Sequence, residues 1–254
     1  MTRSRIADLL AATLVVLAAS VAVSALGMQN AWATTCDTAH NLQIGNASNK
    51  YAGTQPMIFE GVYAELDPTA TIPSLCTTDT NGGVNFASAW IMLFGSDGQS
   101  YDQVGTIYRY GYSCQKWWSE VAKYGDFTDF YLSGCIGSGT AYHLHVYPHQ
   151  TSTGVFVLYS SVNTSVVHIT QFDPFNTFTY PFQVAFDGET YHAVSDVPGV
   201  SGDPTEFANM QVQDYATDLN HSTCGNAILP GFNDNPTHWG RISYSCNDTA
   251  FWSN

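Results

Sequence analysis

The chain has 254 residues, and its 21 acidic residues against 7 basic ones give a formal net charge of −14 at pH 7. A polyanion is repelled by such a surface, and the sequence has no Lys/Arg cluster that could release its counterions. The composition therefore argues against nucleic acid binding.

The N-terminal residues have the pattern of a secretory leader. "MTRSR" supplies a positively charged start, residues 9–26 are almost continuously apolar, and Ala-Trp-Ala at 31–33 fits the small-x-small cleavage pattern. The pattern predicts a signal peptide over 1–33, with an uncleaved membrane anchor as the alternative. Residues 34–254 are then one secreted domain, extracellular and without stable membrane insertion, with 5 basic and 20 acidic residues.

Six cysteines follow the cleavage site: Cys36, Cys76, Cys114, Cys135, Cys224 and Cys246. A secreted protein can oxidise them to disulfides. Sequence alone allows 15 pairings of six cysteines. Closure between nearest neighbours favours 36 with 76, 114 with 135, and 224 with 246. The wide spacing without C-x-x-C disfavours a metal site.

Short runs of Tyr, Phe, Val, Thr and Ile alternate with turn residues, which is the all-β pattern. The expected strands are 57–65, 86–94, 103–112, 127–132, 141–147, 155–160, 166–172, 182–186, 189–194, 207–214 and 241–245. A hairpin loop is expected between Tyr147 and Val155, and a short helix over 115–123. Eleven short strands predict a two-sheet antiparallel β-sandwich of jelly-roll or concanavalin-like form, held by disulfides.

One of these strands carries an unusual glutamine. Alternation along the strand places Gln103, Gly105, Ile107 and Arg109 on one face and Tyr108 on the other. Gly105 leaves an empty place beside Gln103, which would let a ligand approach closely. A solvent-facing glutamine beside a twist-relieving glycine is the structural alternative.

A second segment, "PFQVAFDGETYHAVSDVPG" at 181–199, carries Glu189 after a predicted strand and turn. Together with "SAW" at 88–90 and Gln103 ahead of an x-Gly, this segment resembles the eqolisin-type secreted glutamic peptidases and, more loosely, the neprosin-like proteins. The resemblance spans roughly residues 57–215 and implies a β-sandwich peptidase without metal or cofactor.

The resemblance implies catalytic roles for two residues. Glu189 would act as general base on a water, while the Gln103 amide stabilises the oxyanion, hydrolysing peptide bonds of a protein or peptide substrate at acidic pH. Trp90, Gly105, Tyr108 and Arg109 would line the substrate site.

The sequence departs from the family pattern around Glu189, where the family's glutamate segment contains a tryptophan. Glu206 and Glu65 are competing carboxylates. Neprosin-type enzymes use two glutamates, and Gln103 stands where the first would be, so the chain could also be an inactive relative.

Two histidines offer a different interpretation. His143 and His145, two apart on a strand, could bind a metal with His149 or His192, but packing against Tyr147 is the favoured role. No G-x-S-x-G, H-E-x-x-H or P-loop motif occurs. No metal is expected.

The main rival is a non-catalytic binding module. Aromatic residues near the Gln103 strand could line a groove for carbohydrate or an extended peptide: Trp90, Trp117, Trp118, Tyr108, Tyr110 and Tyr112. In that case Glu189 would lie outside the groove or be neutralised by a basic residue such as Arg109. A monomer is expected in either case.

Overall fold

A computed structural model of the chain describes residues 43–47, 59–69, 71–76, 85–137, 139–179, 182–192, 195–214, 219–224, 232–233 and 237–253. All of them belong to the compact unit Thr34–Asn254. The predicted signal peptide over 1–33 lies outside the described residues. None of the helices formed by these residues has the length and apolarity that a membrane crossing needs.

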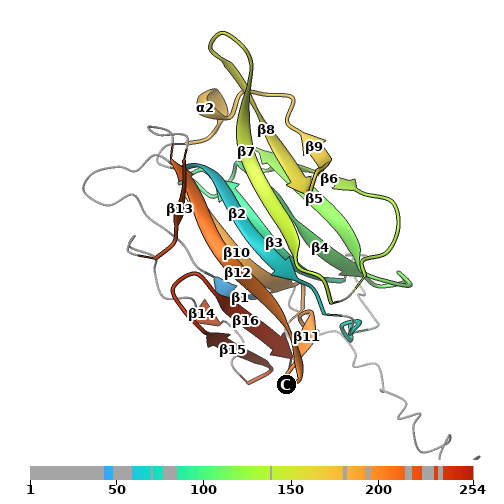
Figure 1. The fold of residues 1–254 in the computed structure, drawn as a ribbon. Helices are drawn as coiled ribbons and strands as arrows, with labels where there is room; N and C mark the ends of the chain where they lie inside the picture. Colours follow the sequence, from blue (N-terminus) through green and yellow to red (C-terminus); the bar gives the residue numbers. More distant parts are fainter. Residues whose placement is uncertain are drawn as a thin grey trace, which may run out of the picture. The chain divides into compact units, whose positions relative to one another are not determined.

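The described residues form two β-sheets that lie face to face (Figure 1). The first has seven strands, in the order β14 (Phe232–Asn233), β1 (Gln43–Ala47), β10 (Gln183–Thr190), β3 (Phe86–Phe94), β4 (Tyr101–Arg109), β5 (Lys116–Lys123) and β6 (Asp126–Tyr131). All its pairs are antiparallel.

The second sheet has nine strands. Its path runs β15 (Trp239–Ser243), β16 (Thr249–Ser253), β11 (Gly199–Val200), β12 (Asp203–Asp214), β2 (Phe59–Asp67), β7 (Tyr142–Ser152), β8 (Val155–Val162) and β9 (Ser165–Ile169), and β13 (Leu219–Ser222) pairs with β12. Only the short β11–β16 pair is parallel among the described pairs of this sheet. The predicted two-sheet sandwich is confirmed.

The core fills the space between the sheets because the inward side chains of both are aliphatic or aromatic. Ile91, Val104 and Phe186 of the first sheet pack with Leu144 and Val212 of the second, and each is at most 1% exposed. Burying a side chain of this kind contributes roughly 1.5–3 kcal/mol.

A second, smaller apolar cluster lies on the opposite face of the seven-stranded sheet. Trp90, Ile107, Trp118 and Ala185 are its buried members. Strands β3 and β10 are consequently buried on both faces over most of their length. This outer cluster surrounds the polar groups described below.

Two predicted elements are wrong in ways that matter for the site. Residues 115–123, expected as a helix, include strand β5, which pairs with β4 on one side and β6 on the other. Pairing on both edges outweighs weak local helix preference. Trp118 and Glu120 therefore share one face of the sheet.

The second error is the break placed between 186 and 189. Strand β10 continues through Asp187 and Gly188 to Thr190, so Glu189 lies within a strand. Asp-Gly usually marks a turn. Here the glycine makes room for Phe251, because a Cβ at position 188 would lie 2.7 Å from Phe251 Cζ.

The hairpin after Tyr147 is also shorter than expected. Strand β7 continues to Ser152, and the turn before β8 contains Gly154 with φ +75°. A short helix, α2 (Pro174–Thr177), follows β9, and the Asp173 side chain caps its first turn by accepting a hydrogen bond from Phe175 N.

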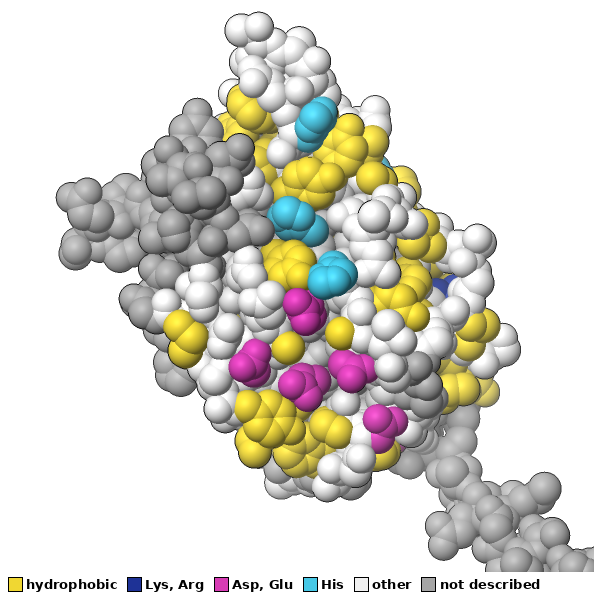
Figure 2. All heavy atoms as spheres, viewed as in Figure 1, with side chains coloured by type: hydrophobic (Ala, Val, Ile, Leu, Met, Phe, Trp, Pro, Cys, Tyr) yellow, Lys and Arg dark blue, Asp and Glu magenta, His cyan; other side chains and the backbone are white. Residues whose placement is uncertain are grey.

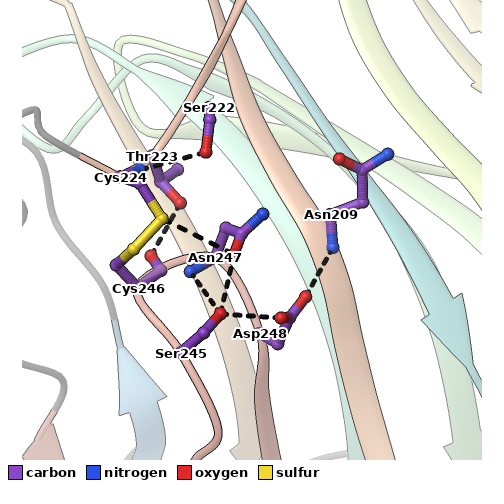
Figure 3. The surroundings of a disulfide bond; sticks show 8 residues. All are labelled: Asn209, Ser222, Thr223, Cys224, Ser245, Cys246, Asn247 and Asp248. Atoms are coloured by element: carbon purple, nitrogen blue, oxygen red, sulfur yellow. Dashed lines mark hydrogen bonds between the residues drawn. A yellow bond between two sulfur atoms is a disulfide. The ribbon is translucent and has the colours of Figure 1, made fainter.

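Two predicted disulfides are confirmed, Cys114–Cys135 and Cys224–Cys246. The first joins the ends of the β5–β6 hairpin. The second links the end of β13 to the loop between β15 and β16, where Ser245 and Asp248 hydrogen-bond each other (Figure 3). Cys76 is also disulfide-bonded, and its predicted partner Cys36 lies outside the described residues.

Candidate active site

Glu189 is placed by β10 on the outer face of the seven-stranded sheet, opposite Ser88 of β3. It is 7% exposed, and Trp90 Nε1 donates a hydrogen bond of 2.5 Å to its Oε2. Burial raises the pKa of Glu189 to about 7, and the charge of Glu120 adds to this rise, while the hydrogen bond from Trp90 opposes it. This carboxyl can therefore hold or release a proton near neutral pH.

Gln103 lies on the same face, two strands away on β4, and is 3% exposed. Its Nε2 donates a 3.1 Å hydrogen bond to Glu120 Oε1, and its Oε1 has no hydrogen-bond partner in the described structure. A buried, unpaired amide oxygen is costly, so this orientation depends on the bond to Glu120.

Glu120, on β5, connects Gln103 to the edge of the sheet. Its Oε1 also accepts a 2.5 Å hydrogen bond from the Tyr101 hydroxyl. Burial raises the pKa of Glu120 to about 7, and the hydrogen bond from Tyr101 partly offsets the effect. The pKa of Tyr101 is also raised, first by burial and then by the charge of Glu120.

Asp129, on β6, is an ionised carboxylate at the end of a row of polar side chains. We call this row, together with the side chains that hydrogen-bond to it, the polar row; its carboxyl and amide members are Glu189, Gln103, Glu120 and Asp129. Its Oδ1 accepts from Trp118 Nε1 at 2.6 Å, and its Oδ2 pairs with Arg109 at 2.7 Å. Burial acts to raise the pKa of Asp129, but the Trp118 hydrogen bond and the Arg109 charge outweigh it, and the pKa is lower than usual. Arg109 therefore neutralises Asp129 and makes no described pair with Glu189.

The predicted substrate residues fall into different places. Trp90 and Arg109 belong to the polar row just described. Gly105 lies beneath Trp90, since a Cβ there would be 2.8 Å from Trp90 Cβ, so the empty place expected beside Gln103 is filled by protein. Tyr108 alternates to the other face of β4, opposite Ala87.

Sequence reasoning missed Glu120, Tyr101 and Asp129, and it named Trp118 only as an aromatic residue of the rival binding groove. Reading 115–123 as a strand would have found Glu120, because alternation puts Trp118 and Glu120 on one face. Trp117 then faces the other way, where its ring lies 4.7 Å from that of Tyr142. The predicted groove combining Trp117 with Trp118 is therefore split between the two faces of the sheet.

The competing carboxylates lie on the other sheet. Glu65 accepts hydrogen bonds from Tyr63 and Asn209, and Glu206 lies close enough to Asp67 and Asp248 for their charges to affect it. The pKa of Glu206 is raised, mainly by burial. Figure 2 shows acidic side chains gathered on this face.

His145 packs against Tyr147 as predicted, whereas His143 contacts Tyr63. His145 stacks on Tyr147 with ring centroids 4.3 Å apart, and His143 Nδ1 hydrogen-bonds the Tyr63 hydroxyl at 2.5 Å. Figure 2 shows histidines in a line along the face formed by β2, β7 and β12. No group of three or more His, Cys, Asp or Glu among the described residues is arranged to hold a metal ion.

These features define a two-sheet β-sandwich with a glutamine and two carboxyls of raised pKa on the outer face of its seven-stranded sheet. The fold is similar to that of scytalido-glutamic peptidase, whose crystal structure contains a peptide-based transition state analog. The two structures agree with a TM-score of 0.51 at 15% sequence identity, over 84% of this chain and 98% of that chain. No protein family model and no curated protein matches the sequence.

Chemically, the Glu189 carboxyl can transfer a proton and the Gln103 amide can stabilise an oxyanion. Glu189 supplies a carboxyl whose two protonation states are both accessible near pH 7, and Gln103 supplies an amide donor already fixed in direction. Both side chains are buried, so a substrate reaches them only if neighbouring groups move aside.

Proposed function

We propose that the protein is a secreted, extracellular endopeptidase of glutamic type, in which Glu189 and Gln103 hydrolyse peptide bonds. The observation that carries the proposal is that a carboxyl of raised pKa and an oriented amide lie on one face of a sheet. This sheet belongs to a β-sandwich whose fold resembles that of a glutamic peptidase. Disulfides, as in Cys114–Cys135, fit an oxidising compartment outside the cytosol.

In the proposed reaction the ionised Glu189 accepts a proton from a water molecule as the water oxygen bonds to the peptide carbonyl carbon. The carbonyl electron pair moves to oxygen, and an N–H of Gln103 stabilises the negative charge that forms. Collapse of this intermediate breaks the C–N bond, and Glu189 returns its proton to the leaving amine. No metal or covalent intermediate takes part.

The pKa of Glu189 moves the expected pH range upward from the acidic one that the resemblance implies. A carboxyl with a pKa of about 7 is ionised in roughly one molecule in a thousand at pH 4. Because the base must be ionised to accept a proton from water, activity is expected to rise from pH 4 toward pH 7.

The experiment compares the purified protein with Glu189→Gln and Gln103→Ala on a denatured protein substrate between pH 3.5 and 7.5. Losing the base should reduce kcat by about 10²–10⁴-fold, and losing the oxyanion donor by about 10²–10³-fold. Glu206→Gln, on the other sheet, is the matched control and should cleave normally. Equal cleavage by all four proteins would refute the assignment.

One observation favours a second function, a binding module for carbohydrate or an extended peptide. Gln103 and Glu189 are 3% and 7% exposed, as in a structural polar network, whereas Phe127 and Tyr131 on β6 are 65% and 37% exposed on the same sheet. Exposed rings can stack on sugars or apolar side chains. Absence of cleavage by the parent protein at every pH would favour this function.

A further inference from the structure

Glu120 lies at the centre of the polar row, between Gln103 and Asp129. Strand register places it directly opposite Gln103 on β4 and directly opposite Asp129 on β6. Side chains opposite each other in an antiparallel pair have Cβ atoms about 4.5–5.5 Å apart. The sheet itself thus holds the three side chains in one line.

One oxygen of Glu120, Oε1, accepts hydrogen bonds from both Gln103 Nε2 and the Tyr101 hydroxyl. Asp129 lies directly opposite Glu120 on β6, and its charge and a hydrogen bond between the two carboxyls act to raise the pKa of Glu120. The oxygens of Asp129 accept from Trp118 and Arg109. Two carboxyl groups can hydrogen-bond each other only if one of them carries a proton, because two ionised carboxylates repel and neither can donate.

The proton belongs to Glu120. Asp129 has a guanidinium partner and an indole donor, which stabilise its ionised form and lower its pKa. Glu120 has only neutral donors, and its burial raises its pKa to about 7. Below neutral pH, Glu120 is therefore a neutral acid that donates to Asp129 and accepts from Gln103.

This arrangement determines which way the Gln103 amide faces. Rotating the amide by 180° would bring its oxygen against Glu120 Oε1, an acceptor already used by two donors, and would lose the 3.1 Å bond. In the observed orientation one N–H is bound to Glu120 and the second remains for a substrate oxygen.

We propose that Glu120 is a positioning residue that fixes the Gln103 amide for oxyanion binding. Only the protonated form of Glu120 holds the amide without adding a negative charge beside it. The proposal rests on the proposed function of Gln103 and Glu189. Ionisation of Glu120 would place a negative charge between Asp129 and Gln103, where it would repel the developing oxyanion. Activity should therefore decline above pH 7.

The other ionisable groups on this face are few. Strand β4 contributes Tyr101 and Arg109, β6 contributes Asp129 and Tyr131, β10 contributes Asp187 and Glu189, and β5 itself contributes Lys116. Arg109 is bound to Asp129, and Lys116 lies over the Tyr112 ring at 4.6 Å. In this arrangement neither cation is paired with the Glu120 carboxylate.

The first test is kinetic and uses Glu120→Gln and Glu120→Ala between pH 4 and 9. The alanine variant should lose about 10–100-fold in kcat at every pH with KM changed less than about threefold, because the amide donor is no longer held. The glutamine variant, which can accept from Gln103 and donate to Asp129, should recover most of that loss and lack the decline above pH 7. Glu206→Gln should behave as the parent protein.

Full kcat in Glu120→Ala would overturn the proposal. So would a Glu120→Gln variant that loses as much as the alanine variant, or one that keeps the parent's decline above pH 7. Each of these results would mean that Glu120 has only a structural role.

A second measurement does not depend on activity. The side-chain N–H resonances of Gln103, assigned with Gln103→Ala, should shift with pH near 7 in the parent, be independent of pH in Glu120→Gln, and move toward unfolded-chain values in Glu120→Ala. If the parent cleaves nothing, the proposed function fails while these spectra still test the positioning role. Gln103 resonances unchanged in Glu120→Ala would overturn it.

Discussion

Trp90 and Glu189 show how a single residue sets the chemistry of its neighbour. The indole Nε1–H donates to Glu189 Oε2, and this bond stabilises the ionised carboxylate against the burial that raises its pKa. A hydrogen bond to a charged group contributes roughly 1.5–3 kcal/mol, equivalent to about 1–2 pKa units. Trp90 therefore keeps Glu189 in the range where it can act as a base.

Trp90→Phe should raise the pKa of Glu189 above 7 by about one unit, because the donor that favours the ionised form is removed. Carboxyl 13C NMR titration measures the shift directly, and the rising limb of the pH profile should move by the same amount. Trp239→Phe is the matched control, since Trp239 is also buried and donates to Ser195 O, away from the polar row. An unchanged or lower Glu189 pKa in Trp90→Phe would contradict this account.

Strands β3 and β4 approach each other so closely at Trp90 that the facing position on β4 has to be a glycine, Gly105. A Cβ at Gly105 would lie 2.6 Å from Trp90 Cα and 2.8 Å from Trp90 Cβ, with backbone atoms that cannot move aside. Gly105→Ala should destabilise the protein by about 1–3 kcal/mol, as overpacking does. Urea unfolding measures this loss, and activity should fall with it because Trp90 is displaced from Glu189.

Gly202→Ala is the control for this prediction, because a Cβ there meets nothing within 4 Å. An exposed change of this kind should alter stability by no more than about 0.5 kcal/mol. If both alanine variants were equally stable, the close approach of β3 and β4 would not be the reason for the glycine.

The elements also show what the sequence can and cannot predict. Strand β3 matches its predicted bounds, 86–94, because an apolar run ends at a clear Gly-Ser-Asp-Gly turn. The Asp-Gly of β10 and the tryptophan pair of β5 were misread because the cause of their conformation is a distant partner, Phe251 in one case and the two flanking strands in the other. The pairing of Gln103 with Glu189 came from the family resemblance, but Glu120, which holds the amide, was hidden by the expected helix.

At the scale of the whole molecule, several buried carboxyls make the fold sensitive to pH. Asp102 lies between the sheets, where Ser160 of β8 donates a 2.5 Å hydrogen bond to its Oδ1 and links β4 to the other layer. Burial raises the pKa of Asp102 to about 7, with the Ser160 hydrogen bond opposing it. Glu120 and Glu189 have similarly raised pKa values.

The direction of the pH effect follows from which state binds more protons. Between about pH 4.5 and 6.5 these three carboxyls are protonated in the folded chain and ionised in the unfolded chain, so they favour folding at lower pH. His145 and His168 act in the opposite direction, since burial lowers the pKa of each to about 4. Among these five groups the folded state holds more protons than the unfolded state, so their joint contribution to stability should fall as pH rises between about 4.5 and 6.5.

Asp102→Asn isolates the contribution of one carboxyl to this pH dependence. Asparagine keeps an oxygen that accepts from Ser160 but cannot ionise, so the variant should gain stability relative to the parent as pH rises from 4.5 to 7. Urea unfolding at both pH values measures the difference. Asp126→Asn, an exposed change on β6, should follow the parent at both pH values. If Asp102→Asn and the parent differed by the same free energy at pH 4.5 and 7, Asp102 would be ionised in the folded protein at both, and the Asp102–Ser160 link between the sheets would be a charged one.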